Sequence, residues 1–150
     1  MTNSVRVFAP AKINLFLHVG DKRADGFHPL ESLAVFVDVG DTLTFERSNE
    51  LFLSIDGPFA EDLNVNEDNL VVKAARALSV TSSIALTKNL PVASGIGGGS
   101  ADAAAALRGL NDLCGLNRSD LADMAATLGS DVPVCVASKS SWMQGRGEIL

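Results

Sequence analysis

The sequence is poor in cysteine, and its two thiols, Cys114 and Cys135, show no metal-ligand spacing. Disulfide frameworks and cysteine-based metal sites repeat their cysteines at short, regular intervals. Cys135 also lies inside the apolar run 132–137. We therefore predict that both cysteines are reduced residues of the core, forming neither a disulfide nor a ligand pair.

The sequence also lacks a basic stripe and a membrane-spanning run. Its twelve lysines and arginines are scattered and its net charge is −6, which gives no support for binding nucleic acid or a membrane surface. No window approaches the roughly 18 uninterrupted apolar residues of a membrane helix, and Met1–Val5 do not open a secretory signal pattern. We expect a soluble, globular, cytoplasmic protein.

The length and composition fit a single domain. With 150 residues, 47% of them apolar, the chain is long enough for one core and too short for two. No internal repeat or long linker is visible. Residues 141–150 end in an apolar pattern that resembles the start of a strand. We expect residues 1–150 to form one domain, truncated at its C-terminal end.

The first third of the chain has the patterns of an antiparallel sheet. Apolar alternation and apolar runs predict strands over Val5–Phe8, Ile13–Val19, Leu33–Val39, Thr42–Phe45 and Leu51–Ile55. Pro10 separates the first two strands, and Asp25-Gly26 and Gly40-Asp41 are predicted turns. In the second strand, Ile13, Leu15, Leu17 and Val19 are expected to share an apolar face.

The rest of the chain mixes helices and strands. In chain order we predict a helix from Asp68 or Asn69 to about Leu78, a strand Ile84–Thr87, a helix Ser100–Leu110, a helix Leu121–Leu128 and a strand Val132–Ala137. Ser119 is expected to cap the third helix and Gly129 to end it in the left-handed conformation. These elements predict an α+β fold.

The stretch Leu90–Ala104 has the layout of a phosphate-binding loop. Gly95, Gly97, Gly98 and Gly99 can adopt positive φ and let main-chain N–H groups approach a polyphosphate closely. The helix that follows would point its unpaired first-turn amides at the same anion. An acidic protein of this kind would bind a polyphosphate through amides, a few placed cations and Mg²⁺.

Other glycine loops fit this stretch less well. A Walker A loop needs a lysine after its last glycine, where the chain has Ser100-Ala101-Asp102. The dinucleotide fingerprint needs a third glycine at Ser100, so it is weaker but stays open. A turn that only packs a helix against a strand also stays open.

Two charged residues could carry chemistry. Lys12 follows a proline between apolar neighbours, and a half-buried lysine beside a polyphosphate would stabilise transferred negative charge. The alternative is a strand lysine that faces water. Asp131 lies at a predicted helix-to-strand junction, where a base can be held rigidly, although a turn aspartate is the simpler interpretation. Asp102 is predicted to complement the helix dipole.

An aromatic residue and an imidazole follow the first predicted turn. Phe27 and His28 could hold a flat ring by stacking and a hydrogen bond. The alternative is a loop anchored by one buried aromatic. His18 has no visible partner and is interpreted as structural.

Taken together, these residues resemble the N-terminal part of the GHMP small-molecule kinases. The resemblance covers nearly the whole chain in four blocks, Ala9–Leu15, Arg23–His28, Pro91–Ala101 and Leu128–Val134. The glycine block is typical of the superfamily. The first two blocks resemble the branch that phosphorylates a cytidine diphosphate-linked methylerythritol in the non-mevalonate isoprenoid pathway.

The resemblance implies a fold, a reaction and a set of site residues. The fold would be α+β, like domain 2 of ribosomal protein S5, and the reaction an ATP-dependent phosphorylation of the substrate's 2-hydroxyl. Lys12 and Asp131 would be catalytic, and Asn14, Phe27 and His28 would bind the substrate. The ATP phosphates would be held by Pro91, Val92, Ala93, Ser94, Gly95, Ile96, Gly97, Gly98, Gly99, Ser100 and Ala101, with Mg²⁺ as cofactor and no protein metal ligand assigned.

The chain departs from the family in two respects. Phe27 stands where the family usually has tyrosine, so a ring remains without its hydroxyl. We expect the family's C-terminal ferredoxin-like domain to be absent from this chain, which can then be an inactive fragment, and a homodimer is possible. Two other functions stay open, namely a non-catalytic S5-like module that binds RNA or protein, which the negative charge disfavours, and a GHMP kinase for another small alcohol.

Overall fold

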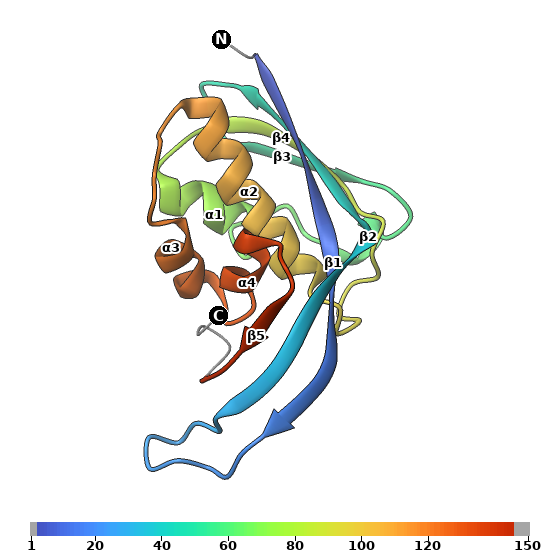
Figure 1. Cartoon of the computed structure of the whole chain (residues 1–150). Helices are drawn as coiled ribbons and strands as arrows, with labels where there is room; N and C mark the ends of the chain where they lie inside the picture. Colours follow the sequence, from blue (N-terminus) through green and yellow to red (C-terminus); the bar gives the residue numbers. More distant parts are fainter. Residues whose placement is uncertain (1–2, 146–150) are drawn as a thin grey trace.

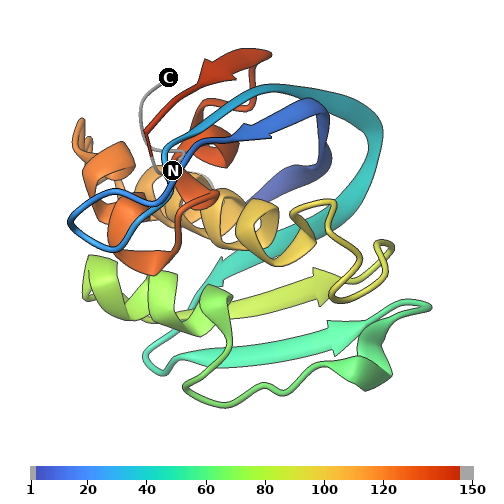
Figure 2. The ribbon, with the colours of Figure 1, turned by 90° about the horizontal axis from the view of Figure 1, so that it is seen from below.

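The computed structural model describes residues 3–145, which form a curved sheet with helices packed on one face (Figures 1 and 2). The strands are β1 (Ser4–Val19), β2 (Leu30–Arg47), β3 (Phe52–Asp56), β4 (Ser82–Thr87) and β5 (Ser141–Met143). Their order in the sheet is β1-β2-β4-β3, and β5 pairs with β2. The helices are α1 (Leu70–Leu78), α2 (Gly98–Cys114), α3 (Leu121–Leu128) and α4 (Val132–Ala137), with a 3-10 turn, η1, at Ala60–Asp62. The predicted α+β class is confirmed.

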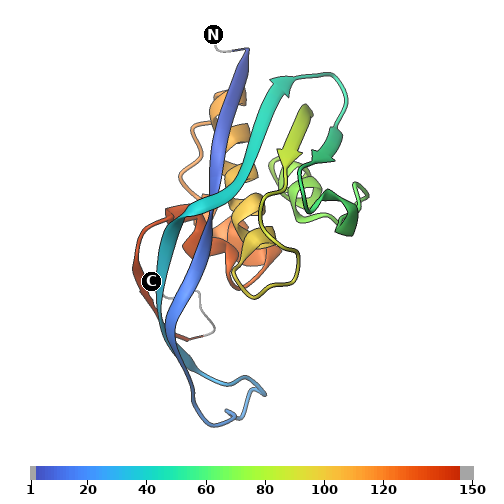
Figure 3. The ribbon, with the colours of Figure 1, turned by 90° about the vertical axis from the view of Figure 1, so that its right-hand side faces the viewer.

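The long strand β2 connects the parts of the sheet. It pairs antiparallel with β1 from Leu30 to Glu46. On its other side, residues 32–34 pair with β5 and residues 42–47 pair with β4. The far end of the β1–β2 hairpin projects beyond the helices (Figure 3). The predicted apolar face at the end of β1 is therefore wrong, because Leu15, Leu17 and Val19 are 61%, 57% and 53% exposed.

The strand break predicted at Pro10 is absent, since β1 is continuous from Ser4 to Val19. β1 lies at the edge of the sheet, where a residue without an N–H group is tolerated. The pairing with β2 shifts between Pro10 and Lys12, where one residue of β1, Ala11, lies opposite three residues of β2, 37–39, so the extra residues of this bulge are in β2. At this irregularity Ala11 and Lys12 are both buried, each only 2% exposed.

The turn predicted at Gly40-Asp41 is also absent, because both residues are buried inside β2. The glycine is required by the neighbouring strand rather than by a turn. A Cβ atom at position 40 would lie 2.2 Å from the carbonyl oxygen of Ala9 and 2.8 Å from its carbonyl carbon. The absence of a side chain thus allows β1 and β2 to pair at this point.

Replacing Gly40 by alanine is expected to lower the free energy of unfolding by about 1–3 kcal/mol, as overfilled cores do. The added methyl meets backbone atoms of Ala9, which cannot rotate away. Urea unfolding measures the change. Gly129→Ala is the matched control, because its φ is an extended 167° and its nearest contact would be an ordinary 3.4 Å. Coincident unfolding curves for Gly40→Ala and the unmodified protein would contradict the expectation.

The strand β3 was predicted as part of an antiparallel meander, but it pairs in parallel with β4. Parallel neighbours need a crossover connection, and here the connection contains η1 and α1. Of the two residues expected at the start of this helix, Asp68 and Asn69, it is Asn69 that caps α1, since its side-chain oxygen accepts the Val71 N–H at 2.9 Å. The predicted strand Ile84–Thr87 is confirmed within β4 and leads into the glycine loop.

The alanine-rich helix α2 lies at the centre of the core and is longer at both ends than the predicted Ser100–Leu110. It packs on β1 and β2 and on the helices α1 and α4. Its small residues allow this close approach, because Ala103–Ala106 are fully buried and a Cβ at Gly109 would meet the Phe45 ring at 2.3 Å. The same small residues bring the glycine loop close to β1.

The segment after α2 differs most from the predicted secondary structure. Helix α3 has the predicted bounds, but its N-cap is Asp120 rather than Ser119, and Gly129 is extended rather than left-handed. Val132–Ala137 was predicted as a strand and is the helix α4. A short apolar run cannot be assigned by periodicity, whereas Pro133 favours the first turn of a helix. Contacts with α2 and α3 bury the apolar residues of α4.

Both cysteines are free, as predicted, with Cys135 buried and Cys114 partly buried. Burial raises the pKa of the Cys135 thiol to about 12, so this thiol stays protonated at neutral pH. Among the helices of residues 3–145, none combines the length and apolarity needed to cross a membrane. The strand-like ending expected for residues 141–150 is confirmed only as β5, and residues 146–150 lie outside the described part.

Candidate functional site

The glycine loop is held in one conformation by backbone contacts. Gly95 and Gly97 have φ of +77° and +68°, which confirms that these positions need the left-handed region. The Ser94 hydroxyl donates to the Pro91 carbonyl at 2.8 Å inside the loop. The Lys12 N–H donates to the Ile96 carbonyl at 2.9 Å. The loop is therefore fastened to β1 at the residue whose side chain was predicted to be catalytic.

The loop leads directly into the N-terminus of α2. Gly97 is the N-cap, and with no side chain it leaves the first-turn N–H groups uncapped. A helix of this length places the positive end of its dipole at these amides. A Cβ at Gly97 would lie 3.3 Å from the Lys12 side chain, so only a small residue fits between α2 and that lysine. This geometry suits an anion.

A cavity of about 430 Å³ opens over the loop and the first turn of α2. Its wall comes from five parts of the chain, namely the residue after η1, the start of α1, the end of β4, the glycine loop with α2, and the turn before α4. The lining residues are Leu63, Asp68, Asn69, Leu70, Val71, Leu86, Lys88, Pro91, Val92, Ala93, Ser94, Gly95, Gly97, Gly98, Gly99, Ser100, Asp102 and Asp131. Of the predicted loop residues, Ile96 and Ala101 do not line it.

Lys12 and Asp131 form an ion pair beside the loop. The Lys12 Nζ atom lies 2.9 Å from Asp131 Oδ2, and the two side chains are 2% and 43% exposed. Asp131 precedes α4 and caps no helix amide with its side chain, so its carboxylate contacts Lys12 and can also meet a ligand from the cavity. The junction predicted for it is a turn between two helices, because Val132–Ala137 is helical. An exposed carboxylate beside a buried cation is a suitable general base.

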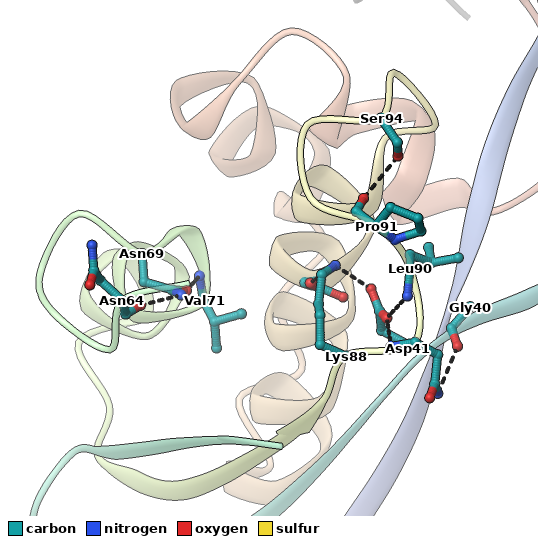
Figure 4. Close-up of polar contacts among 11 residues, drawn as sticks. Gly40, Asp41, Asn64, Asn69, Val71, Lys88, Leu90, Pro91 and Ser94 are labelled. Atoms are coloured by element: carbon teal, nitrogen blue, oxygen red, sulfur yellow. Dashed lines mark hydrogen bonds and ion pairs between the residues drawn. The ribbon is translucent and has the colours of Figure 1, made fainter. Parts of the chain in front are cut away.

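Below the loop lies a charged cluster that the sequence did not reveal (Figure 4). The Lys88 Nζ atom donates to Asp41 Oδ2 at 2.5 Å and to Asp102 Oδ2 at 3.0 Å, and all three side chains are buried. Asp41 Oδ1 accepts the N–H groups of Asn89 at 2.6 Å and Leu90 at 2.8 Å. The three charged residues are far apart in the sequence, so no local spacing could have indicated them.

Asp102 does not lie in the first turn of α2, where an acidic residue was expected to complement the helix dipole. Its carboxyl is buried beneath the loop, and among residues 3–145 its Oδ1 atom has no hydrogen-bond partner. Burial raises the pKa of Asp102 to about 7, the Lys88 cation partly lowers it, and the Asp41 carboxylate raises it further. This carboxyl can therefore gain or lose its proton near neutral pH.

The predicted substrate-binding residues lie away from the cavity. Phe27 and His28 are exposed in the loop at the end of the β1–β2 hairpin, and the glycine loop is elsewhere in the molecule (Figures 1 and 2). The His28 Nδ1 atom lies 2.9 Å from the Gly20 carbonyl oxygen, and Asp25 Oδ1 accepts the Phe27 N–H at 3.1 Å. Asn14 is exposed on β1 between the two regions. The fold thus unites Lys12, Asp131 and the glycine loop, but not these three residues.

Comparisons with known proteins agree with this geometry. The sequence pattern of the GHMP kinases N terminal domain matches residues 69–139. The 4-diphosphocytidyl-2-C-methyl-D-erythritol kinase of Ruegeria pomeroyi is 54% identical over 149 residues, which cover 98% of this chain and 53% of that protein. The enzyme of the same name from Parvibaculum lavamentivorans is 52% identical, with 99% and 54% covered.

A solved structure is similar as well. The crystal structure of a 4-(cytidine 5'-diphospho)-2C-methyl-D-erythritol kinase superposes with a TM-score of 0.81 at 34% identity, covering 97% of this chain and 54% of that one. The chain spans about half the length of the curated relatives it matches. In its glycine loop, its fold and its sequence, the chain is similar to the GHMP kinases, and it has the fold of that family's N-terminal domain.

Proposed function

We propose that this chain provides the ATP-binding site and the catalytic pair of a cytoplasmic kinase that phosphorylates the 2-hydroxyl of 4-diphosphocytidyl-2-C-methyl-D-erythritol. The observation that carries the proposal is the Lys12–Asp131 ion pair, whose Asp131 lines the cavity above the glycine loop. The chain is similar over about half their length to kinases named for this acceptor, which supports the choice of acceptor.

The donor would bind with its phosphates on residues 91–101. The uncapped amides at the start of α2 supply hydrogen-bond donors, and the dipole of this helix favours negative charge at the same place. The apolar lining residues Leu63, Leu70 and Val71 offer a surface for a flat base at the other side of the cavity. Polar and apolar parts of one pocket would thus match the two ends of a nucleotide.

The transfer itself would use the ion pair. Asp131 accepts the proton of the attacking hydroxyl, whose oxygen forms a bond to the γ-phosphorus as the bond from that phosphorus to the bridging oxygen of ADP breaks. The buried Lys12 ammonium orients the Asp131 carboxylate and offsets negative charge near the reacting oxygens. Since the transition state is loose, positioning and charge stabilisation supply most of the acceleration.

Mg²⁺ is expected to enter with the nucleotide and to neutralise charge on its phosphates. Residues 3–145 contain no group of three acidic, histidine or cysteine side chains that could hold a metal ion. The wall nevertheless offers oxygen atoms beside the loop, from the Ser100 hydroxyl and the Asp131 carboxylate. These residues fit a cation that is held mainly by phosphate oxygens.

The acceptor is an extended molecule, with a cytosine at one end and the reacting alcohol at the other. We infer that it lies along β1, with its alcohol at Lys12, Asn14 beside its middle and its cytosine at the hairpin end. A carbonyl oxygen only accepts, so His28 Nδ1 carries the hydrogen toward Gly20, and Nε2 is the nitrogen that would accept from a ligand. Such an acceptor matches the amino group of cytosine, and the exposed Phe27 ring can stack on the base.

A coupled assay of ADP release tests this function on the complete gene product, with the cytidyl substrate and Mg-ATP. Turnover that CMP inhibits competitively is the expected result, because CMP carries the group that the hairpin end would bind. Turnover of a different small alcohol without CMP inhibition would indicate another acceptor. No turnover of either would contradict the proposal, and salt-sensitive binding of RNA would favour a non-catalytic module.

A further inference from the structure

We propose that the buried cluster of Asp41, Lys88 and Asp102 positions the glycine loop by fastening both of its ends, and thereby sets the affinity for the nucleotide through the loop. The proposal deepens the proposed function and rests on it. The proposed transfer uses none of the three residues, and Lys88 and Asp102, although buried, line the floor of the cavity.

The first end of the loop is fastened by Asp41. This residue lies in β2, away from the loop in sequence, and its Oδ1 atom accepts both the Asn89 and the Leu90 N–H groups. The Asn89 side chain adds a bond from Nδ2 to the Gly40 carbonyl at 3.2 Å. The chain therefore leaves β4 in one direction, set by the middle of β2 (Figure 4).

The second end is fastened by Lys88. Its Nζ atom bridges Asp41 to Asp102, which lies in the second turn of α2. A Cβ at Gly98 would lie 3.0 Å from the same Nζ atom, so the ammonium sits against the first residue of the helix. A single cation thus connects the start of the loop to the helix amides at its end.

The burial of this cluster argues for positioning rather than for stability. Buried ion pairs are often no more stabilising than apolar residues of similar volume, because each charge loses its hydration. Here two carboxylates share one ammonium, and one carboxylate oxygen of Asp102 is left without a partner among residues 3–145. What the cluster does provide is directional hydrogen bonds at both ends of one loop.

Two variants of the complete gene product test the proposal, with a fluorescent ATP analogue as the ligand. Asp102→Ala removes the bond to α2. Asp41→Asn keeps the size of the side chain, but its amide can satisfy either the loop N–H groups or Lys88, not both. We expect the Kd for the analogue to rise about tenfold in each variant, while the KM for the cytidyl acceptor stays within about twofold, as for a loss of ground-state binding.

The sign of the change separates this role from a purely electrostatic one. A carboxylate that acted only by its charge would repel the phosphates, so Asp102→Ala would tighten binding. Leu113→Ala is the control for destabilisation, because Leu113 is buried at the opposite end of α2. It should lower the melting temperature and leave the Kd unchanged.

Three results would overturn the proposal. These are tighter binding by Asp102→Ala, a Kd within twofold of the unmodified protein for Asp41→Asn, and a rise in Kd for Leu113→Ala equal to that of the cluster variants. If Asp102→Ala fails to fold, Asp41→Asn decides alone. Failure of the proposed function is distinguishable, because the unmodified protein would then not bind the analogue at all.

Discussion

Replacing Asp131 by asparagine is expected to lower kcat for phosphoryl transfer by about 10²–10⁴-fold, the contribution of a positioned general base. Asparagine has nearly the same shape, and its amide can still approach the Lys12 ammonium, which lies 2.9 Å from Asp131 Oδ2. It cannot accept the proton of the acceptor hydroxyl. Steady-state and single-turnover kinetics with saturating Mg-ATP measure the loss.

The nucleotide affinity of this variant should change little, because the amides of the glycine loop do not depend on Asp131. Asp123→Asn is the matched control, since Asp123 is an exposed aspartate of the neighbouring helix α3. Its kcat should equal that of the unmodified protein. If Asp131→Asn retained full activity, the proton would have another acceptor, and the assignment of the ion pair would fail.

The parts of the fold that the sequence predicted well carry local signals. Asn69 caps α1 through its own side chain, and the glycines before α2 need the positive φ that the sequence indicated. The segment Val132–Ala137 carries no such signal, because an apolar run of this length suits a strand or a buried helix equally well. Its helical form depends on packing against α2 and α3.

The turn predicted at Gly40 and the strand break predicted at Pro10 were wrong for the same reason. Pro10 and Gly40 look like a strand break and a turn, yet they lie opposite each other in the β1–β2 ladder. A neighbouring strand, not the local sequence, determines their role, since Gly40 is needed for the approach of Ala9. Such contacts join residues too distant in sequence for pattern analysis to detect.

In the candidate site, too, only the features with local sequence signals could be predicted. The glycine loop was identifiable from its own residues, whereas the partnership of Lys12 with Asp131 came only from a family resemblance. The irregular pairing beside the buried Lys12, with its extra residues in β2, has no signature in the sequence. Asp41 and Lys88 were overlooked because each looks ordinary until the fold joins them to Asp102.

The raised pKa of Asp102 is expected to make the stability of the protein depend on pH. Its pKa is raised from 3.8 to about 7 by burial in the folded state. Between these values the folded protein keeps a proton that the unfolded chain has lost, so the free energy of unfolding falls as the pH rises from 4 to 7. The pKa difference corresponds to a loss of about 4 kcal/mol, complete above pH 7.

The variant Asp102→Asn cannot titrate and should lack this loss. We expect the stability of the variant relative to the unmodified protein to increase by about 4 kcal/mol between pH 4 and pH 8, measured by urea unfolding at a series of pH values. Groups common to both proteins cancel in the difference. Asp120→Asn is the control, because Arg118 lowers the pKa of this exposed carboxyl and gives a contribution of opposite sign. Parallel stability curves for Asp102→Asn and the unmodified protein would show that Asp102 is ionised throughout, held so by Lys88.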